Sequence, residues 1–181
     1  MIIGLSGYAQ SGKDTVAQIL VEHYGFERVA FADKIREFCY AMNPVVGHVA
    51  NEETILRHVV DRDGWDEAKQ VGGIRRMLQN VGIAAREVFG EKFWIEQALT
   101  GINPTENIVI TDVRFTNEAG AIKEYEGSQI WRIKRLGVKA VNSHVSESEM
   151  DDYAVDQIFL NNGTIEDLKV LVQTRMRGYD L

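Results

Sequence analysis

Short apolar runs alternate with helical spacings along this chain, and the alternation predicts an α/β fold. The apolar runs have the length of buried strands, whereas the spaced apolar positions between them lie on one face of a helix. Strands that alternate with helices form a mainly parallel sheet with helices on both faces. The pattern predicts five strands, at 2–6, 26–32, 108–111, 129–135 and 157–160, and helices at 14–24, 33–42, 117–126 and from 165 onwards.

Two stretches break this rhythm. From 43 to 101 the periodicity is helical throughout, which predicts a helical insertion without strands. The polar residues 137–152 predict a loop. Near the end, Thr164 followed by Asp167 resembles a capping box, which predicts that the last helix begins there.

Length and charge limit the classes of protein to consider. The chain has 181 residues, which predicts one domain over 1–181. With 20 Lys and Arg against 27 Asp and Glu, the net charge is −7, so we expect neither a nucleic acid nor an anionic membrane as partner. No apolar run approaches the roughly 20 residues of a membrane-spanning helix. The single cysteine, Cys39, allows no intrachain disulfide, so a reducing compartment is the simplest setting and we expect a cytoplasmic protein. We expect Cys39 itself to be a core residue.

A glycine-rich loop follows the first predicted strand and carries the first chemical signal. Gly7, Gly12 and Lys13 fit the frame of a phosphate-binding loop, in which backbone N–H groups surround phosphate oxygens at a helix N-terminus. We expect Lys13 to reach the β and γ phosphates of a nucleotide. Further predicted nucleotide contacts come from the same stretch, at Gly7, Gln10, Ser11, Gly12, Asp14 and Thr15.

The loop departs from the standard frame at Asp14, which stands where Ser or Thr usually follows the lysine. The Asp14 carboxylate either lies one shell outside the metal ligands, or is a favourable anion in the first turn of the helix. The sequence leaves both interpretations open.

A second signal follows the strand at 108–111. Asp112 comes directly after this strand, at the carboxyl edge of the predicted parallel sheet. A carboxylate at this edge commonly lies near Mg²⁺. A helix cap is the alternative role for this residue. Arg114 follows two residues later, and its planar guanidinium suits a phosphate, although a solvated surface arginine is the alternative.

Six segments together resemble phage-type deoxynucleoside monophosphate kinases in order and spacing, over nearly the whole chain. They are SGKDT at 11–15, LQNVG at 78–82, KFW at 92–94, DVRFTNE at 112–118, SHVSE at 143–147 and NNGT at 161–164. The resemblance implies a P-loop kinase fold with a helical acceptor-binding region at 43–106 and a lid at 135–152. The GKxT variant is also similar to adenylate-kinase-like enzymes, and this implies that Thr15 helps to bind phosphate and Mg²⁺.

The same resemblance implies roles for residues outside the loop. Asn161 to Gly163 look like the loop that receives the adenine of ATP. The candidates for binding the deoxynucleotide are Asp33, Lys34, Gln79, Arg86, Trp94 and Arg114.

Physical reasoning separates these candidates. Trp94 either stacks on a base or belongs to the core with its apolar neighbours. Arg86 follows two alanines on an apolar helix, so we expect its charge to face a cleft or a carboxylate. Arg75 and Arg76 cannot share one helix face, and Arg75 is the predicted ligand. Arg132 and Arg135 flank the lid, where mobile cations would close over transferring phosphates, and Arg135 is a predicted catalytic residue.

The predicted reaction is transfer of the γ-phosphate of Mg-ATP to a deoxynucleoside monophosphate, with Lys13, Asp112, Arg114 and Arg135 as catalytic residues. Thr15 and Asp112 are the predicted Mg²⁺ ligands. Two alternatives stay open, a dephospho-coenzyme A kinase in which Asp33 acts as a base, and a nucleotide switch without a small acceptor. Small nucleotides are the expected partners, and the sequence determines neither the bases accepted nor whether the chain forms a homodimer.

Overall fold

The computed structural model describes residues 1–49, 52–103, 105–139 and 148–179. The chain divides into two compact units. Unit 1 consists of Met1–Ala30 and Thr100–Leu181, and unit 2 consists of Phe31–Leu99. The predicted lid lies partly outside the described residues, because 140–147 are not among them.

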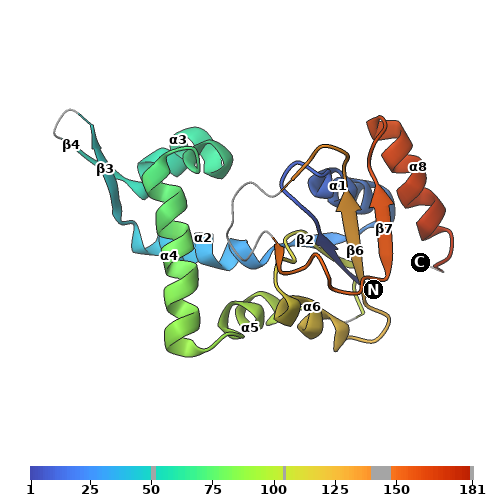
Figure 1. The fold of residues 1–181 in the computed structure, drawn as a ribbon. Coiled ribbons are helices and arrows are strands. Elements are labelled where there is room, and N and C mark those ends of the chain that lie inside the picture. Colours follow the sequence, from blue (N-terminus) through green and yellow to red (C-terminus); the bar gives the residue numbers. More distant parts are fainter. Residues whose placement is uncertain (50–51, 104, 140–147, 180–181) are drawn as a thin grey trace. The chain divides into compact units, whose positions relative to one another are not determined.

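Unit 1 contains a five-stranded sheet in which every pair of neighbours is parallel, as predicted (Figure 1). The order in space is β2-β5-β1-β6-β7. Strand β1 lies at the centre of the sheet, and all five of its residues are buried, as expected for a strand covered on both faces. The strands are β1 (Ile2–Ser6), β2 (Glu27–Val29), β5 (Ile108–Ile110), β6 (Gln129–Lys134) and β7 (Gln157–Leu160).

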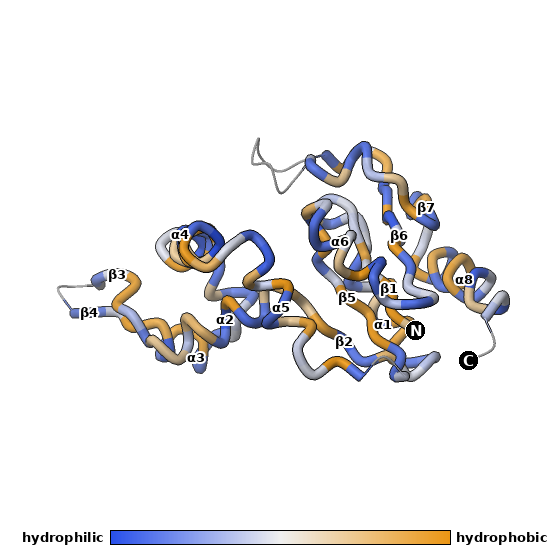
Figure 2. The backbone as a smooth tube through the Cα atoms, turned by 90° about the horizontal axis from the view of Figure 1, so that it is seen from below, coloured by the Kyte–Doolittle hydropathy of each residue, from blue (hydrophilic) through white to orange (hydrophobic). Residues whose placement is uncertain are grey.

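Helices cover both faces of this sheet. On one face, buried residues of α1 (Lys13–Tyr24) and α8 (Ile165–Met176) pack with Ile3, Leu5 and Trp131 of the strands. On the other face, Ile122 of α6 (Thr116–Lys123) lies directly over Gly4, where a side chain would collide with it. Figure 2 shows hydrophobic stretches, in orange, along strands and helices of this unit. The apolar runs of the sequence therefore form the core that was predicted from them.

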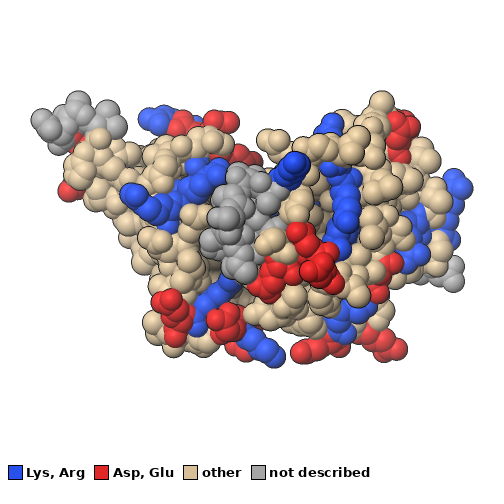
Figure 3. Space-filling view, viewed as in Figure 1, with Lys and Arg blue, Asp and Glu red and all other residues tan. Residues whose placement is uncertain are grey.

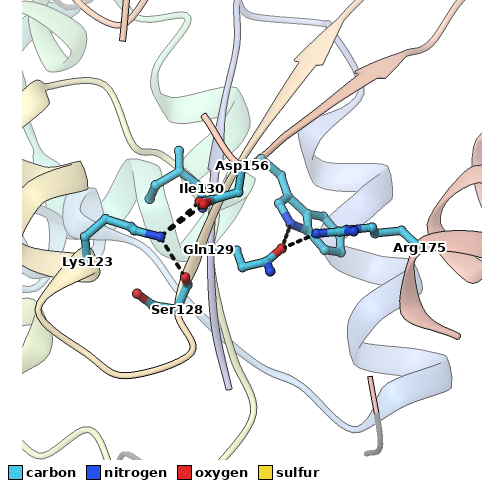
Figure 4. A network of polar contacts seen from close by, with 7 residues as sticks. Lys123, Ser128, Gln129, Ile130, Asp156 and Arg175 are labelled. Atoms are coloured by element: carbon cyan, nitrogen blue, oxygen red, sulfur yellow. Dashed lines mark hydrogen bonds and ion pairs between the residues drawn. The ribbon is translucent and has the colours of Figure 1, made fainter. Parts of the chain in front are cut away.

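A polar network fixes the start of β6. The carboxylate of Asp156 accepts hydrogen bonds from Ile130 N at 2.7 Å and from Lys123 Nζ at 3.1 Å (Figure 4). The amide oxygen of Gln129 accepts from Trp131 Nε1 at 2.8 Å and from Arg175 Nη2 at 3.1 Å. These contacts hold the first residues of β6 between α6 and α8.

Unit 2 is mainly helical, but it also contains an antiparallel hairpin. Its helices are α2 (Phe31–Met42), α3 (Leu56–Ala68), α4 (Gly72–Phe89) and α5 (Phe93–Leu99), and the hairpin is formed by β3 (Val45–Val49) and β4 (Glu52–Ile55). The prediction of an insertion without strands was therefore wrong. Both strands are short, and β4 exposes the side chains of Glu52 and Glu53, so neither gives the alternation that identifies a strand.

Element boundaries also differ where a strand lies at an edge. The strand predicted at 26–32 covers only Glu27–Val29, since β2 pairs with β5 alone and Phe31 already begins α2. Asp33 consequently lies in the first turn of α2 instead of capping it. The capping box of α8 is confirmed, because Asp167 N donates to Thr164 Oγ1 and the Asp167 carboxylate accepts from Thr164 N at 2.8 Å. In the described part of the chain, no helix is long and apolar enough to span a membrane.

Candidate active site

The loop between β1 and α1 has the backbone of a phosphate-binding loop. Gly7 and Gly12 have φ angles of 134° and 105°, in the left-handed region that only glycine adopts without strain. Neither position has room for a side chain, because a Cβ would collide with the Ile133 carbonyl at Gly7 and with the Asn161 amide at Gly12. Helix α1 begins at Lys13, so the N–H groups of its first turn lie at the loop, as in an anion-binding helix N-terminus.

Lys13 is half-buried and lies over this loop. Its Nζ donates hydrogen bonds to the carbonyls of Gly7 at 2.7 Å and Tyr8 at 2.8 Å. Asp14 is exposed in the first turn of α1, where a negative charge interacts favourably with the helix dipole, and Thr15 is half-buried in the same turn. The loop therefore places a cation beside the backbone groups that would surround a phosphate.

Asn161 supports the loop from the other end of the chain. Its side chain is 7% exposed, and its Nδ2 donates to the Ser11 carbonyl at 2.9 Å. Next to it, Asn162 Oδ1 accepts from Leu136 N at 2.8 Å, and Gly163 is exposed. The role of these positions in adenine binding, which the resemblance implies, stays a prediction. Nothing in the sequence indicated that the side-chain amide of Asn161 holds the phosphate-binding loop.

The segment after β5 runs beside the loop. Val113 N donates to the Leu5 carbonyl at 3.1 Å, so this segment continues along β1 past the end of β5. Asp112 is half-buried, and Arg114 is exposed. The arrangement predicted from the sequence, with both residues at the carboxyl edge of the sheet, is what the backbone shows.

Glu118 determines the conformation of this segment, although sequence reasoning gave it no role. The residue is 3% exposed, and its carboxylate accepts hydrogen bonds from Arg114 N at 2.8 Å and Phe115 N at 3.1 Å. The signal was present in the sequence, because a glutamate in the first turn of a predicted helix commonly accepts from amides at the helix start. Glu118 thus fixes the backbone that carries Arg114.

A pocket of about 380 Å³ lies where these segments meet. Figure 3 shows basic and acidic side chains mixed on the face that is drawn, with no broad basic surface. The local positive charge comes from single side chains, among them Arg114, Lys134 and Arg135, which are exposed. The residues that line the pocket are 7–9, 11, 113–114, 132–135, 138 and 150–151.

Arg132 differs from the mobile cation predicted from its place beside the lid. It is 7% exposed, and its guanidinium donates to the carbonyls of Asp151 at 3.0 Å, Tyr153 at 2.9 Å and Met150. A guanidinium with three carbonyl partners is fixed in place, so Arg132 serves the structure of the pocket wall. Sequence position alone cannot distinguish it from Arg135, which is exposed.

The predicted acceptor residues of unit 2 fall into two groups. On α2, Asp33 pairs with Arg36 at 2.9 Å and Lys34 with Glu37 at 2.8 Å. Polar side chains on α4 reach solvent to different extents, because Arg75 and Gln79 are exposed whereas Arg86 is half-buried.

Trp94 does not fit the predicted stacking role. It is 3% exposed, its Nε1 donates to the Gly82 carbonyl at 3.1 Å, and its ring packs against Phe93 with centroids 4.9 Å apart. Helix α5 packs on both α2 and α4, and this buries the side of α5 that carries Trp94. Of the two alternatives, the burial and packing of Trp94 favour a core tryptophan over a side chain that stacks on a base.

Cys39 is a core residue, as predicted. Burial raises the pKa of its thiol to about 11, so the nucleophilic thiolate is not formed near neutral pH.

The side chains predicted to bind metal are suited to Mg²⁺. Thr15 offers a hydroxyl and Asp112 a carboxylate, both half-buried, and oxygen donors are the ligands that Mg²⁺ prefers. Among the described residues no group of three or more His, Cys, Asp or Glu side chains could hold a metal ion by itself. Mg²⁺ is commonly bound through one or two protein oxygens together with substrate phosphates, and this donor set fits that mode.

Comparison with known proteins identifies the family. Residues 62–172 match the model of the deoxynucleotide monophosphate kinase family. A protein of Acanthamoeba polyphaga mimivirus, provisionally named a deoxynucleotide monophosphate kinase, is 31% identical over 183 residues, which cover 92% of this chain and 91% of that protein. The chain belongs to the deoxynucleotide monophosphate kinase family. The family predicted from the six sequence segments is thereby confirmed.

Solved structures confirm the fold class. Shikimate kinase from Aquifex aeolicus superimposes with a TM-score of 0.50 at 12% identity, covering 98% of this chain and 97% of the other. At this identity the likeness shows the fold alone, which is that of P-loop kinases. The family implies a nucleotide as phosphate donor.

Proposed function

We propose that this protein transfers the γ-phosphate of ATP to a deoxynucleoside monophosphate, giving ADP and a deoxynucleoside diphosphate. One observation carries the proposal: the phosphate-binding loop and the arginine that follows β5 line the same pocket, from Gly7 to Ser11 on one side and at Arg114 on the other. A site that joins two phosphorylated substrates needs this combination, because it must neutralise both.

The donor side is formed by the loop and the first turn of α1. Backbone N–H groups of the loop surround the phosphates, and Lys13 moves from the carbonyls of Gly7 and Tyr8 to the phosphate oxygens. Thr15 and Asp112 would hold Mg²⁺, which when bound neutralises charge on the donor phosphates. The donor-binding residues are Gly7, Gln10, Ser11, Gly12, Lys13, Asp14, Thr15, Asn161 and Gly163.

The acceptor side depends on cations more than on a base. A monophosphate loses its second proton near pH ~6, so its oxygen is already nucleophilic at neutral pH. Arg114 and Arg135 would stabilise the charge on the transferring group, as arginines do in phosphoryl transfer. The remaining candidates for acceptor binding are Asp33, Lys34, Arg75, Gln79 and Arg86.

The test is a screen for ADP release with ATP, Mg²⁺ and each common nucleoside and deoxynucleoside monophosphate, together with dephospho-coenzyme A. We expect turnover with at least one deoxynucleoside monophosphate. Turnover with dephospho-coenzyme A alone would assign the hydroxyl-kinase reaction instead, and ADP release that no acceptor increases would indicate a nucleotide switch.

A further inference from the structure

Residues 148–153, the 148–153 segment, precede β7 and are bonded to three different parts of unit 1. Two turns shape the segment, one with Asp151 N donating to the Ser148 carbonyl at 2.9 Å and one with Tyr153 N donating to the Met150 carbonyl at 3.1 Å. These turns direct carbonyls and carboxylates of the same short stretch toward different neighbours.

The first attachment is to the sheet. Arg132 of β6 donates to the carbonyls of Met150, Asp151 and Tyr153 from a guanidinium that is almost fully buried. Since a guanidinium is planar and its donors have fixed directions, three bonds at once hold the segment at one place on β6.

The second attachment is to the phosphate-binding loop. Tyr8 donates its phenolic hydroxyl to Asp151 Oδ2 at 2.7 Å. The carbonyl of the same tyrosine accepts from Lys13 Nζ at 2.8 Å. One residue of the loop is thus joined to the 148–153 segment through its side chain and to the proposed catalytic lysine through its backbone.

The third attachment is to the start of α6. Glu149 Oε1 accepts from both the amide and the hydroxyl of Thr116, each at 2.9 Å. The two preceding amides, of Arg114 and Phe115, donate to the buried carboxylate of Glu118. The three successive backbone amides at 114–116 therefore all donate to carboxylates, and one of these carboxylates belongs to the 148–153 segment.

We propose that Tyr8, Asp151 and Glu149 are positioning residues, which set the phosphate-binding loop and the Arg114 segment at the distance that transfer requires. The inference rests on the proposed function, since the groups positioned are its donor and acceptor cations. Reacting groups held in one geometry react faster, and errors of about 1 Å in that geometry cost roughly 10²-fold in rate. In this role the Tyr8 hydroxyl and the carboxylates of Asp151 and Glu149 act on the loop and on Arg114 through their hydrogen bonds.

The kinetic test is a double-mutant cycle. Tyr8→Phe removes one hydroxyl, and Glu149→Ala removes the carboxylate that binds Thr116. We expect each to lower kcat about three- to tenfold while KM for ATP stays within about twofold, and the double variant to lose clearly less than the product of the two, because both act through one segment. Tyr125→Phe is the matched control, since Tyr125 follows α6 outside the pocket.

Losses that multiply independently would overturn the proposal, as would an effect confined to KM for ATP. Amide hydrogen exchange supplies a readout that needs no substrate. In Tyr8→Phe the amides of Arg114 to Thr116 should exchange at least threefold faster than in the wild type. Faster exchange restricted to residues 7–13 would contradict the coupling.

The two proposals fail in different ways. If the acceptor screen finds no transfer but the exchange at 114–116 responds to Tyr8→Phe, the proposed reaction is wrong and the positioning role of the 148–153 segment stands. If transfer is found and the exchange at 114–116 is unchanged, the proposed reaction stands and the positioning role is wrong.

Discussion

Asn161 and Ser11 lie 150 residues apart in the chain and are joined by a hydrogen bond of 2.9 Å from the asparagine side chain to the serine carbonyl. The Asn161 amide also occupies the space where a side chain at Gly12 would be. The phosphate-binding loop is therefore held in shape by a residue that follows the last strand.

Replacing Asn161 with alanine should weaken this support. The buried Ser11 carbonyl would lose a partner, at a cost of about 1–3 kcal/mol in the free energy of unfolding, and KM for ATP should rise several-fold. Urea denaturation and a coupled ADP assay measure the two effects. Asn162→Ala is the matched control for the free energy of unfolding, because Asn162 is exposed and bonds only the Leu136 amide among the described contacts. Equal losses in the free energy of unfolding for the two substitutions would contradict the structural role of Asn161.

Replacing Lys13 with alanine should leave the fold intact and reduce catalysis. The ammonium contacts two loop carbonyls and contributes little to packing, whereas loss of its charge should lower kcat by on the order of 10² or more. Circular dichroism and steady-state kinetics check both statements, with Lys169→Ala on α8 as the control for loss of one lysine. A kcat close to that of the wild type would exclude Lys13 from the mechanism.

Replacing Arg114 or Arg86 with alanine should impair the acceptor more than ATP, because both residues lie outside the phosphate-binding loop. We expect KM for the acceptor to rise about tenfold or more in each variant, as loss of a charge-assisted contact predicts, with KM for ATP nearly unchanged. A rise in KM for ATP alone would assign the arginine to the donor side, and Arg135 would then become the leading acceptor cation.

The capping box of α8 predicts a dependence of stability on pH. Hydrogen bonds from the backbone and hydroxyl of Thr164 lower the pKa of Asp167 below its usual value. Its stabilising contribution is therefore complete above the pKa of the unfolded chain and is lost as the pH falls through the lower folded pKa. Asp167→Asn should destabilise the protein at pH 7 and have little effect at strongly acidic pH.

Urea midpoints at several pH values measure this difference. Thr164→Ala removes the hydroxyl partner at the helix start and should cost about 1 kcal/mol at neutral pH. A difference between wild type and Asp167→Asn that does not shrink on acidification would show that the ionised carboxylate is not what stabilises the cap.

The sequence predicted best what short-range patterns encode. The apolar runs identified all five strands of the sheet, and glycine spacing identified the phosphate-binding loop. In contrast, the hairpin of β3 and β4 was missed, since its strands are short and β4 exposes two successive residues, Glu52 and Glu53. Local pattern carries little information about such strands.

Side-chain roles were harder to predict, because burial depends on contacts that are distant in sequence. Trp94 was a candidate for base stacking until the packing of α5 placed it in the core. Arg132 and Arg135 look equivalent in the sequence, yet only Arg132 is bonded to three carbonyls of the 148–153 segment. The hydrophobic periodicity of the sequence gives no indication of the long-range contacts made by Asn161 and Glu149.

Direct observation of the product by ³¹P NMR tests the central proposal most directly. A mixture of ATP, Mg²⁺, protein and a deoxynucleoside monophosphate should lose the monophosphate resonance and gain the two resonances of a deoxynucleoside diphosphate, in step with ADP formation. The Lys13→Ala variant should show neither change on the same time scale. Release of inorganic phosphate with the monophosphate resonance intact, for every deoxynucleoside monophosphate tried, would contradict the proposed transfer.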